Sequence, residues 1–272
     1  MPSNEVYSWL RTRFFPHMWC PGCGHGVILH SMLRAFTDLK LDPTNTVLAS
    51  GIGCSSRMPG YVDACTLHTT HGRSLGYATG IKMAKPELTV VDVMGDGDCS
   101  AIGGNHFIHA CRRNIDITAI VMNNNIYGMT GGQASPTTPQ GSKATTAPFG
   151  AIDPNFDICK LAEGAGATFV ARGTIANPKQ AEKFIADGIK HKGFSVVEIV
   201  SSCHTQYGRR NKFRTPISNI ERIKAATVSK TKADSMSPEE LMGKIVVGEF
   251  VNKKMPEYSE QYLKLIEKVR EG

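Results

Sequence analysis

The sequence of 272 residues lacks any run of about 18 consecutive apolar residues, the length that a transmembrane helix requires. Its first segment, MPSNEVYSWLRTRFF, also lacks the unbroken apolar stretch of a signal peptide, because Glu5, Arg11 and Arg13 interrupt it. Internal repeats and low-complexity tracts are absent. With 41% hydrophobic and 20% charged residues, the composition is typical of a globular protein. We therefore expect a cytoplasmic protein with no membrane partner.

Neither charge nor cysteine dominates the chain. Lys and Arg exceed Asp and Glu by 31 to 24, which gives a net charge of +7 that is too diffuse to indicate a nucleic-acid partner. Eight cysteines are too few for a disulfide-stapled scaffold of this length. In a reducing compartment, clustered cysteines indicate metal or redox chemistry instead.

Short apolar segments alternate with segments of helical periodicity along most of the chain. The pattern predicts strands at 46–49, 88–94, 117–122, 167–172 and 194–200, and helices at 26–36, 104–113, 154–164 and 178–192. Such alternation predicts an α/β fold, an open and mostly parallel sheet with helices on both faces. We expect this domain to span 1–214. A C-terminal extension with two helices, the first capped by Ser237, would span 215–272.

Polar or thiol residues follow four of the predicted strands. They are Gly53-Cys54, Asp96-Gly97-Asp98, Asn123-Asn124-Asn125 and Cys203. The carboxyl ends of parallel strands meet at one edge of a sheet, and open sheets bind ligands in the crevice there. These residues therefore predict one composite site.

The segment Gly95-Asp96-Gly97-Asp98 and Asn124 together indicate a divalent cation with a diphosphate. Glycines that flank an acidic residue let backbone N–H groups approach phosphate oxygens, while the Asp96 carboxylate holds a hard cation. Asn124 follows one helix and one strand later, so a βαβ unit brings it to the adjacent loop. Carboxylate, amide, carbonyl and phosphate oxygens suit Mg²⁺. Taken alone, the GDG tripeptide is also compatible with a simple turn.

Four cysteines could form one metal site. Cys20 and Cys23 share a CxxC turn, and Cys54 and Cys203 each follow a predicted strand. Zinc and a 4Fe-4S cluster both use four thiolates, and the spacing leaves both open. The remaining cysteines are expected to pack as small apolar residues; they are Cys65, Cys99, Cys111 and Cys159.

Six ordered blocks resemble the β subunits of 2-oxoacid:ferredoxin oxidoreductases, which bind thiamine diphosphate, and most of all the 2-oxoglutarate type. The blocks are WCPGCGHG (19–26), GIGCSSR (51–57), HGRSLGYATGIK (71–82), GDGDCSAIGGNHFIHACRRN (95–114), NNIYGMTGGQASPTTP (124–139) and CHTQYGRRN (203–211). The resemblance implies a thiamine diphosphate-binding fold. It also implies oxidative decarboxylation of a 2-oxoacid, with coenzyme A as acyl acceptor and ferredoxin as electron acceptor.

The expected substrate is 2-oxoglutarate, which would yield succinyl-CoA and CO₂. Branched-chain 2-oxoacids and pyruvate are the alternative substrates. A non-redox thiamine diphosphate enzyme and a zinc scaffold protein are the alternative functions.

The resemblance also implies roles for particular residues. One 4Fe-4S cluster would be held by Cys20, Cys23, Cys54 and Cys203. Mg²⁺ would be held by Asp96, Asn124 and the backbone carbonyl of Ile126. The cofactor would be contacted by Ile52, Gly53, Cys54, Gly95, Asp96, Gly97, Asp98, Asn124, Ile126 and Thr130.

The glutamate that activates thiamine is missing from the expected edge of the sheet, because Glu87, Glu163 and Glu198 lie before or within helices and strands. The resemblance implies that a partner α subunit supplies it, so the chain alone should turn over little. Small accessory subunits are further candidate partners.

Three side chains are candidates for contact with the substrate. The guanidinium of Arg57 suits a carboxylate, and His71 and Arg73 precede a predicted helix at 75–83. His25 is a candidate for a hydrogen bond to a cluster sulfur or a backbone carbonyl. The basic segment 209–214 is expected to be a solvated or subunit-contacting face.

Overall fold

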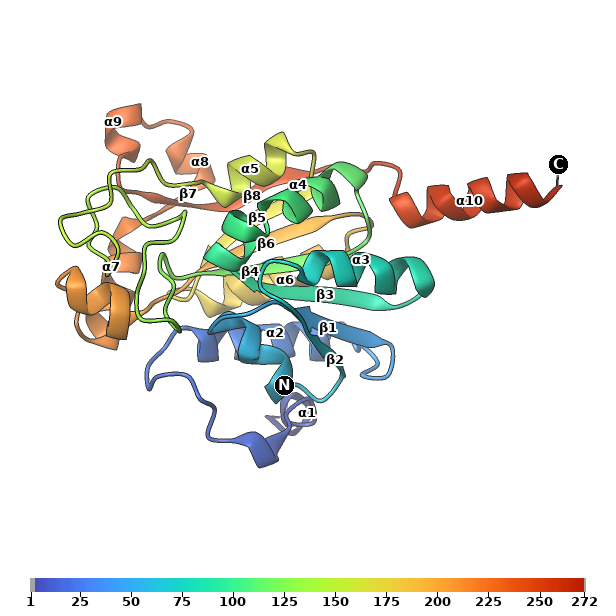
Figure 1. Cartoon of the computed structure of the whole chain (residues 1–272), viewed down its shortest axis with the longest axis horizontal. Coiled ribbons are helices and arrows are strands. Elements are labelled where there is room, and N and C mark those ends of the chain that lie inside the picture. The colour runs from blue at the N-terminus through green and yellow to red at the C-terminus, as the bar shows by residue number, and fades with distance from the viewer. Residues whose placement is uncertain (1–2, 272) are drawn as a thin grey trace.

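A single sheet forms the centre of the computed structural model, which describes residues 3–271 (Figure 1). Within these residues the sheet has eight strands, in the order β2-β1-β3-β4-β6-β5-β8-β7. The strands are β1 (Thr46–Ser50), β2 (Cys65–His68), β3 (Thr89–Gly95), β4 (Thr118–Asn123), β5 (Phe169–Thr174), β6 (Ser195–Val200), β7 (Thr227–Ser229) and β8 (Ile245–Asn252). Strands β1 to β6 pair in parallel, and β8 pairs antiparallel with β5.

The helices precede, connect or follow these strands. They are α1 (Ser3–Tyr7), α2 (His25–Asp38), α3 (Ser74–Ala84), α4 (Gly104–Arg113), α5 (Ile158–Gly164), α6 (Pro178–Lys190), α7 (Pro216–Ala226), α8 (Lys230–Ala233), α9 (Pro238–Leu241) and α10 (Tyr258–Glu271). No helix within residues 3–271 is both long enough and apolar enough to cross a membrane.

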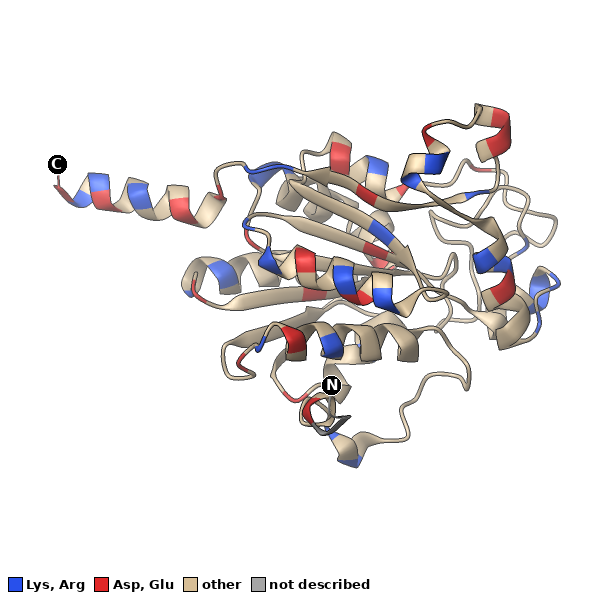
Figure 2. Cartoon of the chain, turned by 180° about the vertical axis from the view of Figure 1, so that it is seen from behind, with Lys and Arg blue, Asp and Glu red and all other residues tan. Residues whose placement is uncertain are grey.

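The sheet has a hydrophobic core on each face, because side chains along a strand point alternately to opposite sides. Ile120 and Met122 of β4 belong to the core that α2 and α6 cover. Ala119 and Val121 of the same strand belong to the core that α3, α4 and α5 cover. Figure 2 shows α2 and α6 from outside, with charges concentrated on helices and loops and few on the central strands. The prediction of a mostly parallel sheet with helices on both faces is confirmed.

The predicted strands and helices of the first 200 residues are present, with shifted ends. Helix α5 begins at Ile158, and Pro154 lies in the loop before it, so the prediction that Pro154 opens this helix was wrong. Asp157 starts the helix instead, because its side chain accepts a hydrogen bond from the Lys160 backbone N–H. Strand β2 was not predicted; it is a short edge strand with partly exposed residues and no clear apolar run.

The C-terminal part holds more structure than two helices. Helix α9 has the expected capping box of Ser237 and Glu240, and α10 projects from the rest of the chain (Figure 1). However, α7, β7, α8 and β8 also lie here, and β8 extends the sheet next to β5. The boundary predicted at residue 214 therefore marks a change in sequence pattern and not a break in the sheet.

Candidate functional site

A cavity of about 280 Å³ opens at the carboxyl ends of β1, β3 and β4. Its walls come from the loops that follow these strands and from the loop that precedes α3. The ten residues predicted to contact a cofactor all line it; they are Ile52, Gly53, Cys54, Gly95, Asp96, Gly97, Asp98, Asn124, Ile126 and Thr130. The parallel strands thus bring together residues that are far apart in sequence.

Asp96 and Asn124 present oxygen ligands at this cavity. The Asp96 side chain is buried, and its Oδ2 accepts hydrogen bonds from Ser135 Oγ at 2.5 Å and Thr137 Oγ1 at 2.6 Å. Burial raises the pKa of Asp96, and these hydroxyl hydrogen bonds oppose the rise. Asn124 Oδ1 accepts from the Ile126 backbone N–H at 3.2 Å.

No basic side chain within residues 3–271 forms an ion pair with Asp96. A buried carboxylate without a counter-charge is costly, and a divalent cation would supply that charge. The oxygen donors of Asp96, Asn124 and the Ile126 backbone also match the preference of Mg²⁺. The residues therefore fit a magnesium ion.

Gly97 allows an aromatic ring to form one side of the cavity. A Cβ at this position would overlap the ring of Tyr127, which lines the cavity. Tyr127 Oη also donates to the Gly97 carbonyl at 3.4 Å. Gly97 is therefore required for this close approach, and not for an unusual backbone angle.

Asp98 ties two loops together. Its Oδ1 accepts from the backbone N–H of Gly72 at 2.6 Å and of Ile52 at 3.3 Å. His71 Nδ1 lies 2.7 Å from the same oxygen and 3.2 Å from the Ile52 carbonyl. Both partners of Nδ1 are acceptors, so Nδ1 carries the proton in the neutral ring and Nε2 is left as an acceptor. Asp98 lines the cavity, and its Oδ1 contacts these groups, so its contact with the cofactor stays a prediction.

The four predicted cluster cysteines line a second cavity of about 290 Å³. They are Cys20, Cys23, Cys54 and Cys203. Burial, together with the neighbouring thiols, raises the pKa of Cys23 to about 12 and that of Cys54 to about 11. Thr205 Oγ1 lies 3.7 Å from the sulfurs of both Cys20 and Cys203. Trp19 Nε1 donates to the Cys54 carbonyl at 2.6 Å and so holds that loop.

The spacing of these sulfurs distinguishes between two kinds of metal site. Within residues 3–271, no three of the four sulfurs lie within 4.8 Å of one another. A tetrahedral zinc ion with Zn–S distances of about 2.3 Å would hold them about 3.8 Å apart. A 4Fe-4S cluster binds one thiolate on each iron and requires wider spacing. The donor set therefore fits an iron–sulfur cluster better than zinc.

The other cysteines were predicted to be packed. Cys99, Cys111 and Cys159 are buried, as expected. Cys65 is exposed, so the prediction was wrong for this residue. The reason is its place on β2, which is the edge strand of the sheet.

Among the three candidate substrate residues, only His71 lines the cavity. Arg57 is exposed on the short helical turn Ser55–Tyr61 and Arg73 is exposed before α3. Arg73 donates to His106 Nε2 at 2.9 Å, and neither arginine is part of the cavity wall. Buried His25 also lines the cavity; its Nδ1 lies 3.1 Å from Ser201 Oγ, and its backbone hydrogen bond to Cys23 partly opposes the rise in the pKa of that thiol. Burial lowers the pKa of His25 to about 4.

Sequence reasoning missed Tyr127, Ser135 and Thr137. Tyr127 lines the cavity, and the two hydroxyls hold Asp96. All three come from the long segment between β4 and α5, which has no helix or strand periodicity. They lie in the block 124–139 that carries the family resemblance, but that resemblance assigned them no role. No glutamate of residues 3–271 lines either cavity, and the buried Glu198 lies on β6 away from them.

Residues 51–199 match the family described as "Thiamine pyrophosphate enzyme, C-terminal TPP binding domain". The fold and the site thus define a thiamine pyrophosphate-binding enzyme domain. The chain is 54% identical over 267 residues to 2-oxoglutarate synthase subunit KorB of Methanocaldococcus jannaschii, covering 98% of this chain and 99% of that protein. It is 48% identical to the KorB subunit of Archaeoglobus fulgidus, covering 98% of this chain and 97% of that protein. The chain belongs to the family of 2-oxoglutarate synthase KorB subunits.

A solved structure agrees with this assignment. It is "2-oxoglutarate:ferredoxin oxidoreductase from Magnetococcus marinus with 2-oxoglutarate, coenzyme A and succinyl-CoA bound", which matches with a TM-score of 0.87 and 33% identity. The match covers 99% of this chain and 92% of that chain. The resemblance noted in the sequence is therefore confirmed. The relatives are named as subunits, so members of this family are parts of larger enzymes.

Proposed function

We propose that this chain is the β subunit of a 2-oxoglutarate:ferredoxin oxidoreductase. It would bind thiamine diphosphate, Mg²⁺ and one 4Fe-4S cluster, and would act in the CoA-dependent conversion of 2-oxoglutarate to succinyl-CoA and CO₂. The observation that carries the proposal is that the cofactor cavity and the cysteine cavity lie side by side. The cofactor cavity and the cysteine cavity share the four residues Cys54, Asn124, Gly128 and Met129.

Thiamine diphosphate, when bound, supplies a nucleophilic carbon for the 2-oxo carbonyl and an electron sink for decarboxylation. The residues of this chain position it. Asp96, Asn124 and the Ile126 carbonyl would hold the Mg²⁺ that neutralises the diphosphate. Gly95 and Gly97 line the cavity, where their backbone would face the diphosphate.

His71 is the group of this chain best placed to hold or move a proton at the reacting end of the cavity. Its Nδ1–H is engaged by Asp98 and the Ile52 carbonyl, so its Nε2 is the atom available to a substrate. Arg57 and Arg73 lie outside the cavity wall, and their predicted contact with the substrate stays a prediction.

The cysteine site explains why this would be a redox enzyme. Cys54 belongs to both cavities, so a cluster bound there would lie against the cofactor. Electrons released by decarboxylation could then leave one at a time to ferredoxin. A non-redox thiamine enzyme has no need of four thiols beside its cofactor.

A partner α subunit would complete the site. Among residues 3–271, no glutamate lines the cofactor cavity, so the carboxylate that activates thiamine would come from that partner. Ferredoxin, coenzyme A and small accessory subunits are further proposed partners, and no nucleic acid is expected. The reducing cytoplasm is the expected location, since it keeps the cysteine thiols free for a metal.

The test is to purify the chain anaerobically with its partner and to measure iron, sulfide, zinc and thiamine diphosphate. We expect about four iron and four sulfide per chain, together with the cofactor. Cys203→Ser should lose cluster content, whereas the exposed Cys65→Ser should retain it. Zinc without sulfide would overturn the redox proposal. Turnover on pyruvate or branched-chain 2-oxoacids above that on 2-oxoglutarate would overturn the substrate assignment.

A further inference from the structure

The segment between β4 and α5 contacts the metal-binding loops through hydroxyl side chains, one of which belongs to Thr137. This segment, residues 124–157, has no helix and only one isolated bridge, between Tyr127 and Gln133. Thr137 lies within it and is 1% exposed. Its Oγ1 lies 2.6 Å from Asp96 Oδ2 and 3.0 Å from Asn123 Oδ1. The Thr137 hydroxyl thus lies beside both the loop that follows β3 and the last residue of β4.

The direction of the Thr137 hydrogen bond follows from the donors and acceptors around it. A carboxylate oxygen and an amide oxygen both accept, and the hydroxyl has one proton for them. Asn123 Oδ1 already accepts from the backbone N–H of Asn125 at 3.0 Å and from its Nδ2 at 3.2 Å. The shorter distance is to Asp96, so Thr137 donates to Asp96 Oδ2. Ser135 and Thr137 both donate to Oδ2 of Asp96, and neither hydroxyl bonds to Oδ1.

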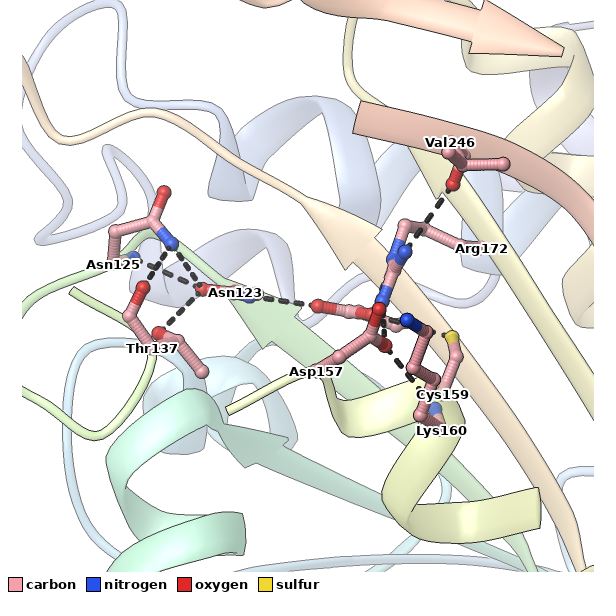
Figure 3. Close-up of polar contacts among 9 residues, drawn as sticks. Asn123, Asn125, Thr137, Asp157, Cys159, Lys160, Arg172 and Val246 are labelled. Carbon is pink, nitrogen blue, oxygen red and sulfur yellow. Dashed lines mark hydrogen bonds and ion pairs between the residues drawn. The ribbon is translucent and has the colours of Figure 1, made fainter. Parts of the chain in front are cut away.

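Asn123 is itself held from the neighbouring strand. Its Nδ2 donates to Glu198 Oε1 at 2.7 Å, and Glu198 Oε2 accepts from Arg172 Nε at 2.6 Å (Figure 3). Asn123, Thr137 and Glu198 are all buried. This contact with Glu198 fixes which end of the Asn123 amide faces Thr137 and Asn125. Asn125 Nδ2 donates both to Asn123 Oδ1 at 3.2 Å and to the Thr137 carbonyl at 2.9 Å. A hydrogen-bonded chain therefore runs from the ion pair in the sheet through Asn123, Asn125 and Thr137 to the carboxylate of Asp96.

The same acidic groups do not form a metal site of their own. Asp157, Cys159 and Glu198 place ligand atoms within 4.8 Å of one another. However, the guanidinium of Arg172 forms ion pairs with both Asp157 and Glu198. Figure 3 shows Arg172 beside Asp157. Their charge is thus already compensated by a cation.

We propose that Thr137 is a positioning residue for the magnesium ion. Its hydroxyl turns the Asp96 carboxylate so that Oδ1 faces the ion, and its carbonyl holds the Asn125 side chain, which lies between the Asn124 and Ile126 ligands in sequence. The inference rests on the proposed function, since it requires Mg²⁺ at Asp96 and Asn124. Groups that orient a metal ligand commonly change metal affinity by about 10- to 100-fold when they are removed.

The experiment uses the enzyme with its partner subunit and titrates Mg²⁺ at saturating thiamine diphosphate, with cofactor binding followed by tryptophan fluorescence or calorimetry. Thr137→Val keeps the shape but removes the hydroxyl, and should raise the apparent Kd for Mg²⁺ at least about tenfold. Thr137→Ser restores the hydroxyl and should return the Kd to within about threefold of the wild type. The unfolding temperature without Mg²⁺ is measured for each variant.

Thr118→Val is the matched control. Thr118 is buried at the first position of β4, at the opposite end of the strand from Asn124, and donates to the Gly188 carbonyl at 3.1 Å. It should lose stability without a change in Mg²⁺ affinity. Equal loss of Mg²⁺ affinity in Thr118→Val and Thr137→Val, or an unchanged Kd in Thr137→Val, would overturn the inference. If the wild type binds no Mg²⁺ with thiamine diphosphate, the proposed function fails instead.

Discussion

Replacing Arg172 with methionine should destabilise the chain strongly. Arg172 on β5 lies directly opposite Glu198 on β6, and their Nε–Oε2 distance is 2.6 Å. The guanidinium also binds Asp157, which caps α5, and donates to the Val246 carbonyl of β8 at 3.3 Å. Burial alone would lower the pKa of Arg172, but the surrounding acidic groups raise it above its usual value, so the side chain stays charged. One residue thus joins two parallel strands, a helix start and the C-terminal strand.

The magnitude follows from the burial of the pair. Relative exposures of the two side chains are 9% for Arg172 and 2% for Glu198. Removing one partner of a buried pair leaves an uncompensated charge and costs about 3–5 kcal/mol. For a chain of this size, 1 kcal/mol shifts the unfolding temperature by about 2–4 °C, so Arg172→Met should lower it by about 10 °C. The assay is thermal unfolding of the purified enzyme at a fixed protein concentration.

A second arginine–glutamate pair provides the control. Arg34 Nε lies 2.7 Å from Glu182 Oε2, but the Arg34 side chain is 34% exposed. Pairs that water reaches contribute about 0–1 kcal/mol, so Arg34→Met should shift the unfolding temperature by at most about 3 °C. Equal shifts for the two variants would refute the argument from burial. Adding Glu198→Gln to Arg172→Met should recover part of the loss, because it removes one uncompensated charge.

Two further predictions concern single positions. Gly97→Ala should weaken thiamine diphosphate binding about tenfold or more, because the added methyl displaces the Tyr127 ring that lines the cavity; equal binding in a direct titration would contradict this. Burial raises the pKa of Asp92 well above its usual value, and the Ser74 hydrogen bond only partly opposes this. The unfolded chain ionises this carboxyl near pH 4, so the wild type loses stability as pH rises above that value. Asp92→Asn should therefore unfold about 2–4 °C higher than the wild type at pH 8 and show little gain near pH 4; a larger gain at the lower pH would contradict the sign.

Much of the cofactor site was predictable because its residues lie next to strand ends. A short apolar run locates a strand, and the residues that follow it must then reach the carboxyl edge of a parallel sheet. Asp96 and Asn124 follow β3 and β4 in this way, and Cys54 and Cys203 follow β1 and β6. Local sequence therefore sufficed to place them together. The tertiary path of the chain did not have to be known.

The groups that support the metal ligands were not predictable on this basis. Ser135 and Thr137 lie in a long segment without periodicity, so no local pattern indicates where the chain returns to Asp96. Strand β8 was missed for a related reason. Its residues are mostly half-exposed, with Gly248 and Glu249 in the middle, so neither alternation nor a continuous apolar run marks it as a strand.

Arg172 and Glu198 did carry a sequence signal, although it was not interpreted. Each is the only charged residue in its predicted strand, and charges are almost never fully buried without a partner. Two opposite charges in two consecutive buried strands therefore indicate that these strands are neighbours in a register that pairs them. The observed register of β5 and β6 places Arg172 opposite Glu198. Isolated charges in buried strands thus contain information on strand order that apolar patterning lacks, and here they identify the pair from which the hydrogen-bonded chain to Asp96 begins.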